Sequence, residues 1–158
     1  MNLPNLGFLK MQNKKLNLGC GSKHKKGYVN IDFRAPADIV ADVTKGLPFA
    51  DGEADLVEAD NLLEHFDNDE FMFVMNEVWR VLKPGGIFWF KVPDALHWMD
   101  GAFGDPTHKR FFVPRSFKYL TETTVYDDYG SAYGFKPWKM VKLDTDARFF
   151  TCELSPKK

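Results

Sequence analysis

The sequence Leu16-Asn-Leu-Gly-Cys-Gly21 is the first indication of the fold, because it joins a short apolar strand directly to a turn with two glycines one residue apart. Glycine at the end of a strand lets main-chain N–H groups approach a bound ligand closely, at the carboxyl edge where open α/β sheets hold ligands. A dinucleotide-binding loop would have a third glycine at position 24, where His24 stands instead. This departure disfavours a nicotinamide-dependent oxidoreductase, which is kept only as the last alternative.

Two acidic residues follow the glycine turn, each near the end of a predicted strand. Residues 28–33 are rich in β-branched and aromatic side chains and contain Asp32, and residues 38–43 form a similar run that contains Asp42. A carboxylate at the end of the second strand can accept hydrogen bonds from both hydroxyls of an adenosine ribose. The second carboxylate falls where the adenine edge of the same ligand would lie. Taken singly, each acid is also consistent with the exposed end of a strand.

One helix and several strands complete the pattern. Apolar residues recur every three or four positions over 71–82, Asp67 is placed to cap this helix, and Lys83-Pro-Gly85 ends it. The run 87–92 is almost continuously apolar, which is typical of a strand buried on both faces of a parallel sheet. Further strands are predicted at residues 55–59, 139–144 and 147–154, the last two as an antiparallel hairpin. The elements predict a mostly parallel α/β sheet with an antiparallel edge.

Composition limits the class of protein. The chain has 158 residues, a formal net charge of -1 and 44% hydrophobic residues, which indicates one globular domain over 1–158. No apolar run approaches the ~20 residues that span a bilayer, so no membrane partner is expected. Cys20 and Cys152 are too few for a disulfide framework, and the first 15 residues have no signal-peptide pattern. We therefore expect a cytoplasmic location and free thiols.

Charge is unevenly distributed along the chain. Residues 1–31, which include a predicted N-terminal arm at 1–15, carry six lysines and no acid, whereas residues 32–70 are strongly acidic. The basic segment could contact a phosphate-bearing partner, but a solvated surface is the favoured interpretation. Because the total charge is near zero, nucleic acid is an unlikely partner.

Five motifs occur together in a specific order. They are LNLGCG at 16–21, NID at 30–32, ADVTKGLPFADGEADLV at 41–57, LLEHF at 62–66 and EVWRVLKPGGIFWFKVPD at 77–94. This combination resembles the class I S-adenosylmethionine-dependent methyltransferases, and more closely their small single-domain type 11 group. The resemblance covers about half of the chain. It implies a Rossmann-like, seven-stranded, mostly parallel sheet with an antiparallel C-terminal edge strand and helices on both faces.

The resemblance also implies that the cofactor is S-adenosylmethionine. In the family, the glycine loop holds the methionine part, the acid after the second strand holds the ribose, the acid before the LPF segment reads the adenine, and the end of the fourth strand faces the methyl group. The corresponding residues are Gly19, Cys20, Gly21, Asp32, Phe33, Asp42, Val43, Asp60 and Asn61. One departure is that only six residues, Ser22–Gly27, stand where relatives have a full helix. The active site is therefore expected to be open, or closed by a neighbouring subunit.

Three residues are candidates for a general base. Methyl transfer from a sulfonium is an in-line displacement, so an enzyme contributes mainly by positioning and by taking a proton from the acceptor. Asp60 ends the fourth strand, His65 belongs to the Glu64-His65 pair, and His108 belongs to a DPTH segment. Histidine titrates near neutrality, but packing at a helix start and pinning of a loop are the structural alternatives. No group of His, Cys and acidic residues has metal-site spacing, so no metal is expected.

The segment 95–120 is predicted to form the substrate side of the site, with a short helix at 115–120 over its mouth. Lys109 and Arg110 could hold an anionic substrate there. Aromatic residues in the loops are open to two interpretations, the lining of a pocket or the interface of a homodimer. They are Trp98, Phe103, Phe111, Phe112, Tyr126, Tyr129 and Tyr133.

Taken together, the residues and the resemblance predict an S-adenosylmethionine-dependent enzyme that methylates an oxygen or nitrogen of a small-molecule acceptor. Two alternatives stay open. One is a non-catalytic S-adenosylmethionine-binding subunit, which would bind the cofactor without turnover. The other is a nucleic-acid or protein methyltransferase that uses the N-terminal lysines, which would show salt-dependent affinity for RNA or DNA.

Overall fold

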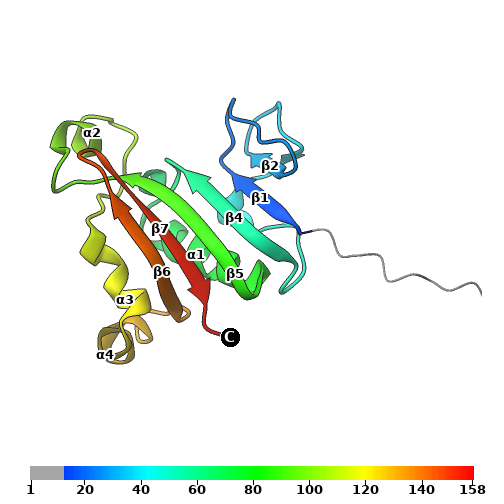
Figure 1. The fold of residues 1–158 in the computed structure, drawn as a ribbon. Helices are drawn as coiled ribbons and strands as arrows, with labels where there is room; N and C mark the ends of the chain where they lie inside the picture. Colours follow the sequence, from blue (N-terminus) through cyan, green and yellow to red (C-terminus); the bar gives the residue numbers. More distant parts are fainter. Residues whose placement is uncertain (1–12) are drawn as a thin grey trace, which may run out of the picture.

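The computed structural model describes residues 13–158, so most of the predicted arm at 1–15 lies outside the described residues. Seven strands and several short helices follow one another along this part of the chain (Figure 1). The strands are β1 Lys15–Leu18, β2 Val29–Asp32, β3 Ile39–Val40, β4 Ala54–Asp60, β5 Leu82–Pro93, β6 Trp138–Thr145 and β7 Phe149–Pro156. The α-helices are α1 Asn68–Val81, α2 Met99–Phe103, α3 Lys118–Thr121 and α4 Thr123–Val125. The remaining helical turns are η1 Val43–Lys45, η2 Leu63–His65, η3 Pro114–Phe117 and η4 Tyr126–Gly130.

All seven strands form one sheet in the order β3-β2-β1-β4-β5-β7-β6. Strands β1 to β5 are parallel to one another, and β7 is antiparallel to both β5 and β6. The predicted seven-stranded, mostly parallel sheet is confirmed. The C-terminal strand β7 is antiparallel as expected, but it lies one position in from the edge, because its hairpin partner β6 takes the outermost place.

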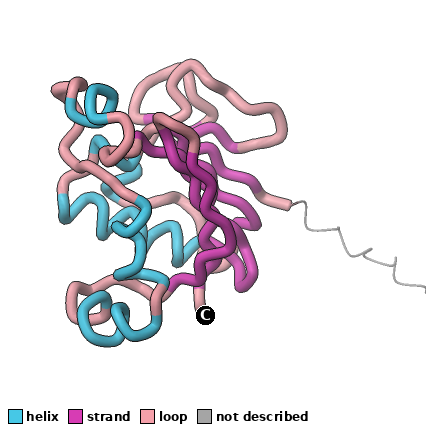
Figure 2. The backbone as a smooth tube through the Cα atoms, turned by 60° about the vertical axis from the view of Figure 1, so that its left-hand side comes forward, coloured by secondary structure: helices cyan, strands magenta, loops and turns pink. Residues whose placement is uncertain are grey.

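Among residues 13–158 the helices lie on one face of the sheet (Figure 2), whereas the prediction placed helices on both faces. Figure 2 shows α1 to α4 on one side of the strands. The helix face is packed with aromatic rings, and Phe117 of η3 contacts Phe90 of β5 and Phe150 of β7, with ring centroids 4.8 Å and 5.9 Å apart. The physical reason is the length of the connections: in both segments that follow β1 and β2, 19–28 and 33–38, the chain forms only turns and bends.

The strand 87–92 therefore has one buried and one half-buried face, and its predicted burial on both faces is wrong. Phe88 and Phe90 are fully buried, whereas Ile87, Trp89 and Lys91 between them are half-buried. On that side the ammonium of Lys25 lies 5.5 Å from the Trp89 ring centroid. The apolar run hid an alternation, because tryptophan and isoleucine tolerate a partly solvated sheet surface.

Helix α1 matches its prediction closely. Asp67 is the N-cap: its Oδ1 accepts from the Glu70 N–H at 2.9 Å, while Glu70 Oε2 accepts from the Asp67 N–H at 2.9 Å. This reciprocal capping box satisfies two main-chain donors that a helix start otherwise leaves unpaired. The buried residues recur with helical spacing and face the sheet; they are Phe71, Val74, Met75, Val78 and Val81. Along the described part of the chain, none of the helices is long and apolar enough to cross a membrane.

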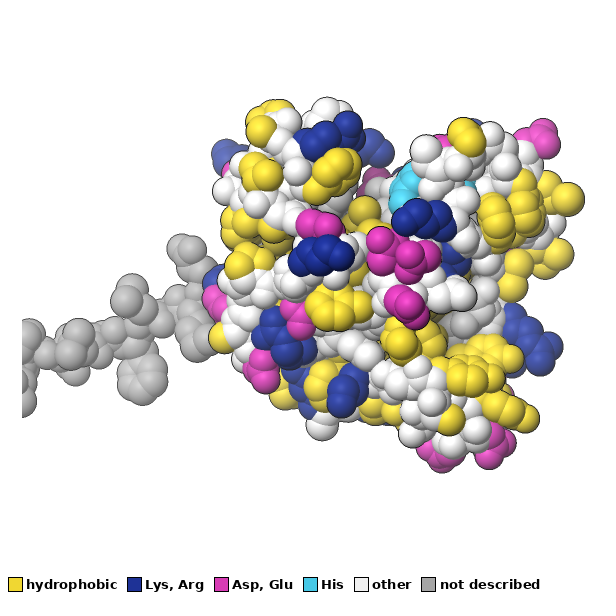
Figure 3. Space-filling view, turned by 180° about the vertical axis from the view of Figure 1, so that it is seen from behind, with side chains coloured by type: hydrophobic (Ala, Val, Ile, Leu, Met, Phe, Trp, Pro, Cys, Tyr) yellow, Lys and Arg dark blue, Asp and Glu magenta, His cyan; other side chains and the backbone are white. Residues whose placement is uncertain are grey.

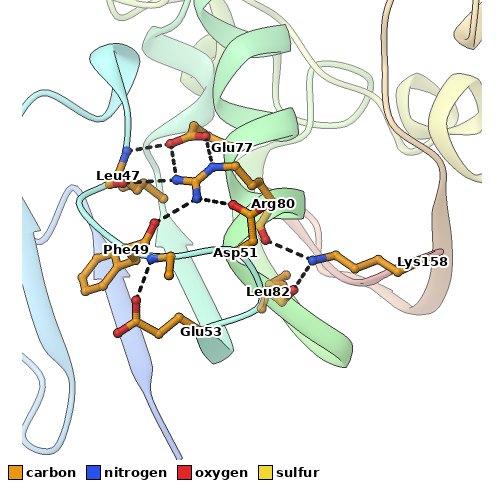
Figure 4. A network of polar contacts seen from close by, with 9 residues as sticks. Leu47, Phe49, Asp51, Glu53, Glu77, Arg80, Leu82 and Lys158 are labelled. Carbon is orange, nitrogen blue, oxygen red and sulfur yellow. Dashed lines mark hydrogen bonds and ion pairs between the residues drawn. The ribbon is translucent and has the colours of Figure 1, made fainter.

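The guanidinium of Arg80, near the end of α1, holds the loop that leads into β4 (Figure 4). It donates to the carbonyls of Leu47 at 3.2 Å and Phe49 at 2.9 Å, and it pairs with Asp51 at 2.7 Å and Glu77 at 2.6 Å. The hydrogen bonds to both carboxylates raise the pKa of Arg80, so it stays charged. These contacts give the LPF segment, residues 47–49, a structural role.

Two other expectations need correction. Only Ile39 and Val40 of the predicted strand 38–43 pair with β2, because the chain turns at Asp42 into η1. The predicted helix at 115–120 forms as η3 and α3, but Phe117 and Leu120 are buried in the hydrophobic core. This helix packs on the sheet through these two residues and does not line the cavity described below, and its predicted place over the mouth of the site stays a prediction.

Candidate active site

The glycine loop after β1 is held against the end of β2. The Gly21 N–H donates to Asp32 Oδ2 at 2.9 Å, and the Cys20 N–H donates to the Ile31 carbonyl at 3.1 Å. Gly19 has φ +62 and Gly21 has φ +48, a region that L-residues other than glycine rarely adopt. A Cβ on Gly19 would lie 2.6 Å from Leu62 Cδ1. Glycine at position 19 therefore permits both the turn and the approach of Leu62.

Asp32 is buried at the carboxyl end of β2, with 7% of its surface exposed. Its Oδ1 accepts from the Arg34 N–H at 3.0 Å, and its Oδ2 accepts from Gly21. Two main-chain donors thus fix the orientation of the carboxylate. Each oxygen keeps a further lone pair that can accept from a ligand hydroxyl.

Asp42 is the N-cap of η1. Its Oδ1 accepts from both the N–H and the hydroxyl of Thr44, at 2.9 Å and 2.7 Å. These bonds lower the pKa of Asp42, so its carboxylate is ionised at neutral pH. Its Oδ2 has no hydrogen-bond partner among residues 13–158 and remains available to a donor such as an exocyclic amine.

A cavity of about 500 Å³ brings the separate predictions together. Its walls contain six predicted site residues, namely Gly19, Asp32, Phe33, Asp42, Val43 and His65. Sequence reasoning assigned no cofactor role to the other lining residues, which are Arg34, Ala41, Leu62, Phe66, Thr107 and Lys109. Figure 3 shows the hollow between two lobes in the upper part of the molecule, with histidine beside it. The lining comes from both the β1–β3 side and the loop after α2.

Five predicted site residues, namely Cys20, Gly21, Asp60, Asn61 and His108, do not line this cavity. Gly21 borders a neighbouring open depression of about 630 Å³, which also includes Asp32, and Cys20 is buried behind the loop. Asp60, at the end of β4, pairs with Lys91 at 2.6 Å and Lys23 at 3.4 Å. Burial alone would raise the pKa of Asp60, but these two lysines lower it overall, which weakens its case as a base.

Asn61, directly after β4, adopts φ +52, the one positive φ of a non-glycine residue in the described chain. Its N–H donates to the Lys91 carbonyl at 3.0 Å, and its Oδ1 is buried without a hydrogen-bond partner. Sparsely populated backbone conformations persist only where the surroundings impose them, and they concentrate at functional sites. The predicted role of Asn61 beside the methyl group stays a prediction.

The two histidine candidates meet at one end of the cavity. The rings of His65, in η2, and His108, in the loop after α2, contact edge to face with centroids 4.9 Å apart. The two segments are joined by main-chain bonds, because the Glu64 carbonyl accepts from the N–H groups of Lys109 at 2.9 Å and Arg110 at 3.0 Å. The DPTH loop is thereby placed over η2, next to the cavity.

Glu64 is the residue whose environment sequence reasoning missed. Only 2% of it is exposed, and neither carboxylate oxygen has a hydrogen-bond partner among the described residues. Burial raises the pKa of Glu64 to about 7. A titratable side chain with a perturbed pKa beside a cleft is a mark of functional sites. The LLEHF motif pointed to the pair, but burial of the glutamate depends on the packing of the DPTH loop.

The basic and aromatic residues predicted for the substrate side do not gather at one site. Lys109 lines the cavity and pairs with Glu70 at 3.0 Å, whereas the Arg110 guanidinium lies 4.4 Å from the Phe71 ring centroid. None of the seven loop aromatics predicted to line a pocket or a dimer interface lines this cavity, whose aromatic lining residues are Phe33 and Phe66. Phe103 stacks on Phe111 at 4.1 Å, and a second exposed cluster consists of Tyr119, Tyr129 and Tyr133.

The fold is that of the class I S-adenosylmethionine-dependent methyltransferases. A family model described as a methyltransferase domain matches residues 16–90, and this part of the chain belongs to that family. No curated protein sequence matches the chain significantly.

Several solved structures share the fold. An S-adenosylmethionine-dependent methyltransferase from Archaeoglobus fulgidus has TM-score 0.65 and 14% identity, over 92% of this chain and 86% of that one. The Burkholderia thailandensis 1,6-didemethyltoxoflavin-N1-methyltransferase, bound to 1,6-didemethyltoxoflavin and S-adenosylhomocysteine, has TM-score 0.64 and 11% identity, over 91% and 71%. A chain of the complex between the Haloferax volcanii Trm112 methyltransferase activator and a methyltransferase has TM-score 0.61 and 16% identity, over 92% and 84%.

Proposed function

We propose that this methyltransferase transfers the methyl group of S-adenosylmethionine to an oxygen or nitrogen of a small molecule. The observation that carries the proposal is a cavity of about 500 Å³ at the carboxyl edge of the sheet, whose lining includes Gly19, Asp32, Asp42 and His65. A cavity of this size suits a nucleoside-sized ligand and a small acceptor.

The cofactor's orientation follows from the donors and acceptors of the walls. The methionine part lies over the main chain of Gly19–Gly21, where the loop comes closest to the cavity. The ribose hydroxyls donate to Asp32, and the adenine amine donates to Asp42. The adenine ring packs between the apolar side chains of Phe33 and Val43. The sulfonium and its methyl group are then directed toward the β4 end, at Asp60 and Asn61.

The acceptor enters beside the DPTH loop, because Thr107 and Lys109 form the wall opposite the glycine loop. The bound didemethyltoxoflavin of the Burkholderia relative supports a small acceptor. The net charge of -1 argues against a nucleic-acid acceptor. The acceptor's proton is taken by the cluster of Glu64, His65 and His108, since Asp60 is already paired with two lysines.

A second candidate is a non-catalytic cofactor-binding subunit that needs a partner. It is favoured by the helix-free face of the sheet and by the Haloferax relative, whose complex contains a methyltransferase activator. In this second candidate the partner can also be a second copy of this chain, as in the homodimer expected from the exposed aromatic residues. The predicted cytoplasmic location is supported by Cys20 and Cys152, which are both free and buried.

Calorimetric titration of the purified chain tests the function without knowledge of the acceptor. S-adenosylmethionine and S-adenosylhomocysteine should each bind one-to-one, and NADH should not bind. Binding without turnover of any small acceptor, followed by turnover when a partner protein is added, would favour the second candidate. A folded chain that binds neither sulfur ligand would contradict both.

A further inference from the structure

A second potential binding site lies at the rim of the cofactor cavity. One ligand atom from each of Glu64, His65 and His108 lies within 4.8 Å of the other two. We propose that these three side chains form a site for a divalent transition-metal ion of the Zn²⁺ class. Imidazole nitrogens and a carboxylate oxygen are the donors that such ions take, and a two-His-one-Glu set leaves at least one coordination position open.

The hydrogen bonds of both imidazoles leave the nitrogen that a metal needs. His108 Nδ1 lies 2.8 Å from the Ala102 carbonyl, which only accepts, so Nδ1 carries the proton. His65 Nδ1 lies 3.1 Å from the Thr107 hydroxyl, and that hydroxyl already donates to Asp105 at 2.7 Å. His65 Nδ1 is therefore also the protonated nitrogen. Both rings keep a lone pair on Nε2, and each is oriented by a second contact, as metal-binding histidines are.

Glu64 supplies the independent observation. Its side chain is 98% removed from solvent, and both carboxylate oxygens lack a partner among the described residues. A buried carboxylate without hydrogen bonds is costly, so it must take up a proton or meet a cation. The position is built for a cation, because the Asp105 carboxylate adds a second negative charge 3.7 Å from His108 Nε2.

Metal binding requires only side-chain movement. Ligand atoms around a tetrahedral ion with bonds of about 2.0–2.1 Å stand about 3.3 Å apart. The three atoms are within 4.8 Å of one another, so rotation of the His65 and Glu64 side chains closes the set. His65 and Thr107 line the cofactor cavity, which places the ion beside the acceptor end of that cavity.

The role of the ion rests on the proposed function. With the ion bound, the three side chains are ligands and no longer take the acceptor's proton. An acceptor hydroxyl at the open position would instead lose its proton to bulk water more readily, because the ion stabilises the oxygen anion. That oxygen then bonds to the methyl carbon as the carbon–sulfur bond breaks, and the electron pair stays on the sulfur of S-adenosylhomocysteine. Acceptors with a hydroxyl or a chelating oxygen are the substrate class that this site favours.

Equilibrium dialysis of the metal-free full chain against Zn²⁺ tests the proposal, with Co²⁺ absorption as a second readout. One ion per chain should bind. Loss of a residue that only hydrogen-bonds to a metal ligand weakens metal binding by about 10–100-fold. Glu64→Gln, His65→Ala and His108→Ala each remove a ligand, so each should weaken Zn²⁺ binding by more than that. His24→Ala, an exposed histidine outside the cluster, is the matched control and should bind normally.

Three outcomes would overturn the site: no saturable binding, equal binding in all variants, or loss of binding only in His24→Ala. Circular dichroism of Glu64→Gln, which is nearly isosteric, guards against misfolding as the cause of a loss. Cofactor titration on the same metal-free samples separates the two proposals. Normal S-adenosylmethionine binding without Zn²⁺ binding removes the metal site alone, whereas Zn²⁺ binding without cofactor binding removes the methyltransferase proposal alone.

Discussion

The N–H of Gly21 donates to Oδ2 of Asp32 at 2.9 Å, which ties the glycine loop to the end of β2. One carboxylate therefore has two roles: it fixes the loop, and it is the proposed acceptor for the ribose hydroxyls. Because the loop and the acid belong to adjacent parallel strands, both are placed by the register in which Leu18 pairs with Ile31.

Asp32→Ala should weaken S-adenosylhomocysteine binding by roughly 2–4 kcal/mol, through the loss of two charge-assisted hydrogen bonds. Calorimetric titration measures the change. Asp38→Ala is a matched control, because Asp38 also accepts two bonds, both from Asn30 at 2.8 Å, yet it does not line the cavity. Equal affinity of Asp32→Ala and wild type would refute the ribose assignment.

Gly19→Ala and Gly21→Ala should separate strain from cofactor binding. Both positions have positive φ, so each alanine should lower the free energy of unfolding by roughly 1–2 kcal/mol in urea titrations. Only at Gly19 does the new Cβ meet another side chain, Leu62, which lines the cavity. Gly19→Ala should therefore weaken cofactor binding more than Gly21→Ala, and Leu62→Ala in the same chain should restore part of it. Identical affinities of the two single variants would contradict the role of Leu62.

Arg80→Lys should destabilise the fold by about 2 kcal/mol, because an ammonium cannot replace a planar guanidinium that bridges two carboxylates and two carbonyls. Chemical denaturation measures the loss. Arg115→Lys, at an exposed position on η3, provides the comparison and should be neutral. If the two variants were equally stable, the Arg80 contacts would contribute little.

Glu64→Gln should change how stability depends on pH in metal-free protein. Burial raises the pKa of Glu64 from 4.5 to about 7, so the folded chain holds this proton more tightly than the unfolded chain. The proton on Glu64 therefore adds to the free energy of unfolding, on the order of 3 kcal/mol. This stabilisation is fully present below pH 4.5 and is lost as the pH rises through about 7. Glutamine has no proton to lose, so the variant should gain relative to wild type across this window. A stability difference that is constant with pH would rule this out.

His108→Ala should leave cofactor affinity unchanged while it slows methyl transfer by roughly 10²- to 10⁴-fold, the usual contribution of a positioned acid–base group. The His108 ring contacts the ring of His65, which lines the cofactor cavity, but His108 itself does not line that cavity. Initial rates with an identified acceptor measure the effect. An unchanged rate would return His108 to a role in pinning the loop through the Ala102 carbonyl.

Features set by local chemistry were predictable. The capping role of Asp67, the helical spacing of α1 and the glycine turn after β1 depend on neighbouring residues, so composition and spacing were sufficient to predict them. The acids at 32 and 42 were also found, because strand ends and turns are marked by local residue types. The end of β3 could not be predicted. The backbone near Asp42 can either continue its pairing with β2 or turn into η1, where the Asp42 side chain accepts from Thr44.

Most strands, the long helix and the strand ends where polar groups collect could be predicted from the sequence, because periodicity and turn residues act over a few positions. Three features depend on the tertiary structure: among residues 13–158 the helices gather on one face of the sheet (Figure 2), Asp60 pairs with two lysines, and Glu64 is buried against a loop more than 40 residues away. The physical reason is that burial and pairing are properties of contacts between distant segments. Such contacts set the pKa of Glu64 and bring His65 to His108, and no local pattern records them.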